Sequence, residues 1–163
     1  GFIGLVRGKV GDTAEVQFFN ADLVAGWQHL YFAALNALTV FRSQMNISNS
    51  LAVETLLYAS AQRQINNAIE KLGVKPETSQ VAVLALSENR KSIKKVLEVV
   101  SGLMNGERDD SVLELTEGKS ESVKRLFGIS DVELQAKLEN EKGEKQALTD
   151  LVIEHVALLS TKR

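Results

Sequence analysis

Few residues of this 163-residue chain have types and spacings that could do chemistry. The sequence contains no cysteine, which excludes thiolate catalysis, disulfides and cysteine-ligated metal centres. Its two histidines, His29 and His155, lie at opposite ends of the chain and do not have metal-ligand spacing. A general base at His29 would need a nearby nucleophile or orienting partner, which the sequence does not place. A surface or locally hydrogen-bonded histidine is the simpler interpretation.

Two other groups of residues could bind ligands, but their spacing argues against it. The three glycines between residues 4 and 11 match neither a P-loop nor a dinucleotide-binding motif, so we interpret them as strand ends and turns. Glu107, Asp109 and Asp110 do not have the spacing of an EF-hand loop, and an acidic turn is the simpler interpretation. No Ser-His-Asp or paired-carboxylate arrangement is found. The sequence therefore predicts a protein with no catalytic residue, no metal and no cofactor.

Composition limits the classes of function further. The chain has 19 basic and 21 acidic side chains, a net charge of −2, which excludes a generally basic nucleic-acid binder but not a local basic patch. Apolar residues make up 44% of the sequence, as in a typical globular domain. No apolar run reaches the length of a membrane span and no signal-peptide pattern opens the chain. We expect one cytoplasmic domain over residues 1–163, without a membrane partner.

The elements that must position any site are a few strands and many helices. This mixture predicts an α/β (α+β) fold in which a small sheet is covered by several helices. Apolar runs predict the strands, and helical spacing or capping signals predict the helices. The expected strands cover residues 2–6, 14–19, 81–86 and 112–115, and four of the expected helices cover residues 23–42, 50–72, 120–127 and 144–160. Ser87 is expected to cap a further helix that carries Val96 and Val100, and the capping box of Ser130 and Glu133 is expected to open another.

Three of the expected helices carry informative faces. In the first long helix a single stripe is expected to face the core. In the second, Glu54 projects onto the core arc, where it can favour the helix N-terminus or accept a hydrogen bond from a buried partner, whereas Arg63 points away. The last helix is apolar over most of its circumference, which suggests a central position or a second face that meets another protein. The stripe of the first helix consists of Leu23, Trp27, Leu30, Tyr31, Ala34, Leu38 and Phe41.

Several segments together resemble a known family. They are residues 20–26 (Asn-Ala-Asp-Leu-Val-Ala-Gly), residues 42–48 and residues 54–65, which include the block Leu-Leu-Tyr-Ala-Ser-x-Gln-Arg-Gln-Ile. Residues 68–74 continue the match, and the order of elements agrees over nearly the whole chain. The sequence resembles the archaeal branch of the PRPK-binding protein family (Cgi family), the small regulatory subunit of the KEOPS complex.

The resemblance implies a function that composition cannot show. It implies a non-catalytic adaptor that binds and stimulates the small atypical kinase of KEOPS. Through a separate catalytic subunit, that complex makes threonylcarbamoyladenosine in tRNA. The resemblance also implies binding of the single-stranded 3′ CCA end of tRNA. We expect the tRNA contact at Arg42, Asn46, Ser60, Gln62, Arg63 and Gln64, because Arg and Gln side chains can stack on and hydrogen-bond to splayed bases.

The kinase is expected on the last helix, centred on Ile153, Val156 and Ala157. These residues form the apolar arc that remains once Leu148, Leu151, Val152 and Leu159 are assigned to the core. Two alternatives remain open. One is a structural domain that forms homo-oligomers through its last helix, and the other is a small-molecule enzyme that uses His29 or Glu54.

Overall fold

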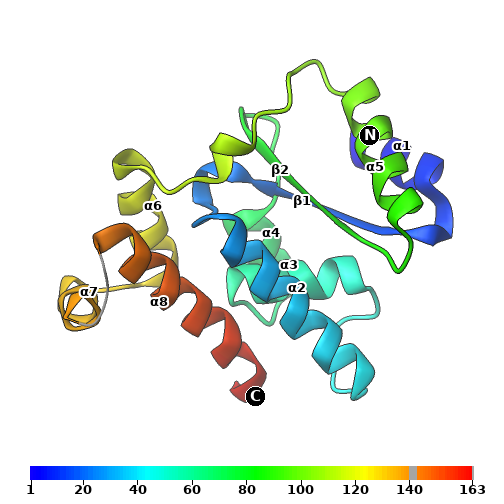
Figure 1. The fold of residues 1–163 in the computed structure, drawn as a ribbon. Coiled ribbons are helices and arrows are strands. Elements are labelled where there is room, and N and C mark those ends of the chain that lie inside the picture. The colour runs from blue at the N-terminus through cyan, green and yellow to red at the C-terminus, as the bar shows by residue number, and fades with distance from the viewer. Residues whose placement is uncertain (140–142, 163) are drawn as a thin grey trace.

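A two-stranded antiparallel sheet lies between two layers of helices in the computed structural model, which describes residues 1–139 and 143–162 (Figure 1). Strand β1 (Glu15–Asn20) pairs with β2 (Val81–Leu86), with Glu15 opposite Leu86. Side chains alternate across the strands, so Phe18 and Phe19 enter different cores. The predicted small sheet covered by helices is confirmed, and so are two of the predicted strands.

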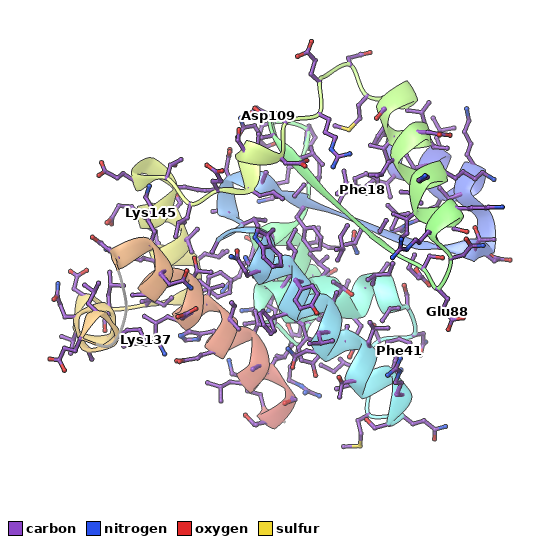
Figure 2. The ribbon with its side chains drawn as sticks, in the orientation of Figure 1. Phe18, Phe41, Glu88, Asp109, Lys137 and Lys145 are labelled. Atoms are coloured by element: carbon purple, nitrogen blue, oxygen red, sulfur yellow. The ribbon has the colours of Figure 1, made fainter. Side chains whose placement is uncertain are left out.

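One face of the sheet is covered by α1 (Phe2–Val10) and α5 (Arg90–Leu103). Val6 and Val96 pack there against Phe18, which Figure 2 shows beside α5. The predicted strand over residues 2–6 is wrong, because this segment is helical. The apolar residues of the segment bury one helical face against α5 and leave Leu5 exposed, so tertiary packing overrides the local strand preference.

The opposite face is covered by α2 (Trp27–Arg42), α3 (Leu51–Ser60) and α4 (Ile65–Leu72). The predicted stripe of α2 is partly wrong, because Trp27 and Tyr31 are exposed. Small alanines occupy the centre of the buried face instead and let α3 pack closely on α2. The buried residues of α2 are His29, Leu30, Ala33, Ala34, Ala37 and Val40.

The predicted helix over residues 50–72 is interrupted. The α3 helix ends at Ser60, and Ala61 has left-handed backbone angles (φ 54°, ψ 39°) that turn the chain before α4 begins at Ile65. The amide of Ala61 caps α3 by donating to the carbonyls of Leu57 and Tyr58. No glycine or proline marks this break in the sequence, so the apolar pattern alone could not reveal it.

The remaining helices form a second core beside the first. They are α6 (Glu117–Phe127), α7 (Asp131–Leu138) and α8 (Glu144–Leu158). The predicted capping box at the start of α7 is confirmed. Helix α8 joins the two cores, with Leu148 packed in the second and Val156 in the first. In the described residues, no helix is long and apolar enough to cross a membrane.

The predicted strand over residues 112–115 is wrong. A 3-10 turn (Asp110–Leu113) takes its place, and buried Lys119 donates to the carbonyls of Val112 (2.8 Å) and Glu114 (3.2 Å). These carbonyls are therefore bound to an ammonium group rather than to a strand. Burial lowers the pKa of Lys119 to about 8. Three other short 3-10 turns cover Gly11–Thr13, Ala21–Leu23 and Leu159–Thr161.

Candidate functional site

The predicted tRNA residues are distributed over the two ends of α3. Arg42 ends α2, and Asn46 lies in the loop that leads into α3, whereas Arg63 and its neighbours follow the C-terminal end of α3. The ten residues of α3 span about 15 Å at 1.5 Å per residue. The structure therefore does not bring Arg42 and Asn46 together with Gln62, Arg63 and Gln64.

A buried carboxylate fixes the loop at the N-terminal end of α3. Glu54 is completely buried, and its oxygens accept hydrogen bonds from the backbone amides of Ile47 (2.9 Å) and Ser48 (2.7 Å) and from the Ser48 hydroxyl (2.7 Å). Ser50 caps α3 by accepting from the amide of Val53. Of the two roles that the sequence allowed for Glu54, acceptance of hydrogen bonds from buried partners is confirmed. Asn46 donates to the carbonyl of Ser48, within the same loop.

The turn at the C-terminal end of α3 is more open. Arg63 and Gln64 are exposed, and Gln62 is half-buried. The Arg63 guanidinium donates to the backbone carbonyl of Lys162 (2.6 Å), so the C-terminal segment lies against this turn. Gln64 accepts from Asn67 (3.1 Å). Ser60 differs from the others, since it is 2% exposed and its hydroxyl donates to the carbonyl of Leu56 (2.8 Å). The expectation that Ser60 belongs to an accessible patch is therefore wrong.

His29 attaches the C-terminal end of α3 to the start of α2. Its Nδ1 accepts from the amide of Ala25 (3.0 Å), so Nε2 carries the proton and donates to the carbonyl of Ala59 (2.7 Å). The ring is completely buried, and Phe127 meets it edge-on. Burial lowers the pKa of His29 to about 4, so the imidazole is neutral at pH 7. Both ring nitrogens bind backbone groups, which is a structural role.

The residues predicted to bind the kinase do not share one surface. Val156 is fully buried and packs in the first core with Leu159. The expectation that Val156 lies on an outward apolar arc is wrong, because α8 packs against both α2 and α7 and buries more of its circumference than one neighbour would. Ile153 is half-buried and Ala157 is exposed. These two residues remain available to a partner.

An exposed apolar stripe that the sequence did not reveal runs along α2. Trp27, Tyr31 and Leu35 follow one another at intervals of one turn and are 59%, 52% and 44% exposed. The rings of Trp27 and Tyr31 meet edge-on, with centroids 5.9 Å apart. An exposed row of aromatic and aliphatic side chains is typical of a protein interface. The sequence signal for this stripe is the row of alanines in α2. These alanines can form the buried face of the helix, so the larger apolar residues can lie on its exposed face.

Two surface hollows lie away from all of these residues. The first, of about 510 Å³, is bounded by β2, α5 and the loop that carries Asp109 (Figure 2). The second, of about 490 Å³, is lined by residues around Lys119. Within the described residues, no group of three His, Asp or Glu side chains could hold a metal ion. Neither hollow contains a predicted site residue, so the candidate sites are surfaces rather than pockets.

Comparison with known proteins shows the family of the chain. A family model described as kinase binding protein CGI-121 matches residues 6–160. The chain belongs to this family. It is also 35% identical, over 115 residues, to the regulatory protein Cgi121 of Methanocaldococcus jannaschii, and the match covers 71% of each chain. The predicted resemblance to the Cgi family is confirmed.

Proposed function

We propose that this chain is the small regulatory subunit of a KEOPS complex in the cytoplasm, where it binds and stimulates an atypical kinase and helps to recruit tRNA. The observation that carries the proposal is the match of a kinase-binding family over nearly the whole chain. The archaeal relative is named a regulatory protein, which also supports the proposal. Recruitment through the tRNA 3′ CCA end, in support of threonylcarbamoyladenosine formation, follows from the resemblance of residues 42–48 and 54–65.

The kinase has two candidate docking surfaces on neighbouring helices. Helix α2 presents the exposed stripe Trp27–Tyr31–Leu35, and α8 presents Ile153 and Ala157. Figure 1 shows α2 and α8 side by side, and the two helices pack against each other. The α2 stripe contains two exposed aromatic residues, and aromatic residues often dominate binding energy at protein interfaces. We therefore place the main kinase contact on α2, with α8 at its side.

Single arginine substitutions test this placement. Tyr31→Arg should weaken kinase binding at least about 100-fold, because it places a charge in a desolvated apolar interface. Ala157→Arg should weaken binding less. Val132→Arg is the matched control, since Val132 is an apolar residue of α7 with 80% exposure. Calorimetry with the purified kinase measures all three variants. Normal binding by folded Tyr31→Arg together with loss of binding by Ala157→Arg would move the docking surface to α8.

The tRNA end has two candidate contacts, one at each end of α3. We place the 3′ CCA end at the turn of Gln62, Arg63 and Gln64, because these side chains are accessible and two of them carry amide groups that can pair with base edges. Arg63→Gln should weaken binding of a short RNA ending in CCA about tenfold, whereas Arg42→Gln should leave it unchanged. Gel-shift titration measures both. The reverse pattern would place the RNA end at the loop of Asn46.

A homo-oligomer is the competing interpretation of the α2 stripe, since an exposed apolar row also suits self-association. Light scattering on the purified chain, with and without the kinase, separates the two. A monomer that forms a complex only with kinase supports the adaptor. A dimer that persists alone and disappears in Tyr31→Arg supports self-association.

A further inference from the structure

The exposed side of α5 carries a dense group of positive charges. Arg90, Lys91, Lys94 and Lys95 fall within six residues, and all four are exposed. At about 100° per residue they lie within an arc of roughly 140°, opposite the side that buries Val96. We call these four residues the basic arc. The first half of the chain, by comparison, has six basic residues in 87 positions.

The basic arc is unfavourable for the helix that carries it. Two of its residues occupy the first turn, where the positive end of the helix dipole repels cations. Lys91 and Lys95 are like charges one turn apart, as are Arg90 and Lys94, and such pairs destabilise a helix. Among the described residues, no carboxylate lies within 4.0 Å of any of the four cationic groups. The first-turn cations and the like-charge pairs therefore disfavour α5 itself.

In three other helices the charged residues are placed so that they suit the helix dipole. Each of α6, α7 and α8 has an acidic residue in its first turn and a basic residue or histidine in its last turn, which suits the dipole. Helix α5 has no acid in its first turn and no base in its last turn. Glu88, which precedes α5 (Figure 2), and Glu98 reduce the local charge but leave a net excess of two positive charges over residues 88–98, since four cations stand against two carboxylates.

The side chains of the basic arc indicate which class of anion they fit. Protein interfaces are depleted in lysine and enriched in aromatic residues, whereas three of these four residues are lysine and residues 90–102 contain no aromatic residue. A helix that lies on a membrane needs an exposed apolar side, but the apolar side of α5 is buried against the sheet and α1. Splayed single-stranded bases are read by aromatic rings, arginine planes and side-chain amides, and residues 90–102 contain a single arginine and no aromatic residue, Asn or Gln. The phosphate backbone of a folded RNA needs only accessible cations.

We propose that the basic arc of α5 binds phosphates of the tRNA body, as a second contact separate from the one that holds the 3′ end. This inference rests on the proposed function, because it takes tRNA as the ligand. Helices α5 and α3 cover opposite faces of the sheet, so a short single-stranded end bound at the turn after α3 does not reach the basic arc. The basic arc adds salt-dependent affinity for the whole tRNA, and the turn recognises its end.

A triple variant tests the inference. Lys91→Gln/Lys94→Gln/Lys95→Gln should weaken binding of whole tRNA at least about tenfold at 100 mM salt and reduce the slope of log K against log salt by about 2 to 3, near 0.9 per lost phosphate contact. Binding of a short CCA-ended RNA should not change. The control Lys75→Gln/Arg125→Gln/Lys145→Gln removes the same charge from exposed positions elsewhere and should have little effect. Thermal unfolding should show that the test variant is at least as stable as the parent.

The outcomes separate this inference from the proposed function. If the test variant binds whole tRNA with unchanged affinity and slope while the CCA-ended RNA still binds, the basic arc is not an RNA contact and the proposed function stands. If the parent protein binds neither RNA, both are wrong. If the parent sediments with phosphatidylserine vesicles, the test variant does not, and tRNA binding is equal in both, the basic arc is a membrane contact and the inference is overturned.

Discussion

The two ends of α3 are attached to the rest of the protein in opposite ways. At the N-terminal end a buried carboxylate, Glu54, accepts hydrogen bonds from three donors and fixes the preceding loop. At the C-terminal end a buried imidazole, His29, donates to the carbonyl of Ala59, and beyond it the chain turns outward through Ala61 to the exposed Arg63. The first end is fixed by a buried acidic side chain, and the second combines a neutral imidazole with an accessible turn. The accessible turn therefore follows a helix whose two ends are both fixed by buried hydrogen bonds.

The largest effect is expected from removing the carboxylate. Glu54→Ala leaves three donors without their acceptor in a buried position and should lower the free energy of unfolding by about 4 kcal/mol. Urea denaturation measures it. Glu70→Ala is the matched control, since Glu70 is exposed on α4 and should change stability by less than about 0.5 kcal/mol. A loss below about 1 kcal/mol for Glu54→Ala would show that the loop is held by other contacts.

The next largest effect is expected from protonating the imidazole. The pKa of His29 is lowered from 6.5 to about 4 in the folded protein, so between these values the unfolded chain binds more protons than the folded one. Stability should therefore fall as the pH falls from about 6.5 to 4, by about 3 kcal/mol in total, and the contribution of His29 is fully present above pH 6.5. Denaturation of the parent and of His29→Gln at pH 7, 5.5 and 4 measures this. Equal pH dependence in both proteins would contradict the assignment.

The smallest effect on stability is expected at the turn itself. Arg63 is exposed and makes a single hydrogen bond to the carbonyl of Lys162, so Arg63→Gln should cost less than about 1 kcal/mol. The same variant should weaken binding of the CCA-ended RNA, so stability and binding are separable at this end of α3. Denaturation by urea beside the gel-shift titration gives both quantities. A stability loss comparable to that of Glu54→Ala would make Arg63 a structural residue.

The sequence predicts those elements whose signals are local. The continuous apolar run of β2 and the capping box of Ser130 and Glu133 are confirmed, because their formation depends on a few adjacent residues. The segment over residues 2–6 is a helix because α5 packs against it, and residues 112–115 are not a strand because Lys119 binds their carbonyls. In both cases the deciding partner lies elsewhere in the sequence, beyond the reach of local propensity.

The same limit applies to the candidate site. The sequence shows the apolar character of α8 but not the helices that cover it, so it predicts an outward position for Val156, which is buried. Helical spacing alone assigns the stripe of α2 to the core, and spacing does not show that the alanines on the neighbouring side are the residues that become buried. Arg63 was correctly expected to point outward. Its separation from Arg42 follows from the length of α3, which lies between the two residues in the fold.

The position of α8 has a consequence for biosynthesis. This helix follows every other helix and strand of the fold along the chain, and it completes the two cores through Leu148 and Val156. A ribosome adds about 5–20 residues per second from the N-terminus, so the preceding elements emerge while α8 is still missing. During that interval both cores lack one wall and expose apolar surface. Neither core can close until α8 has been synthesised, because this one helix contributes Leu148 to one core and Val156 to the other.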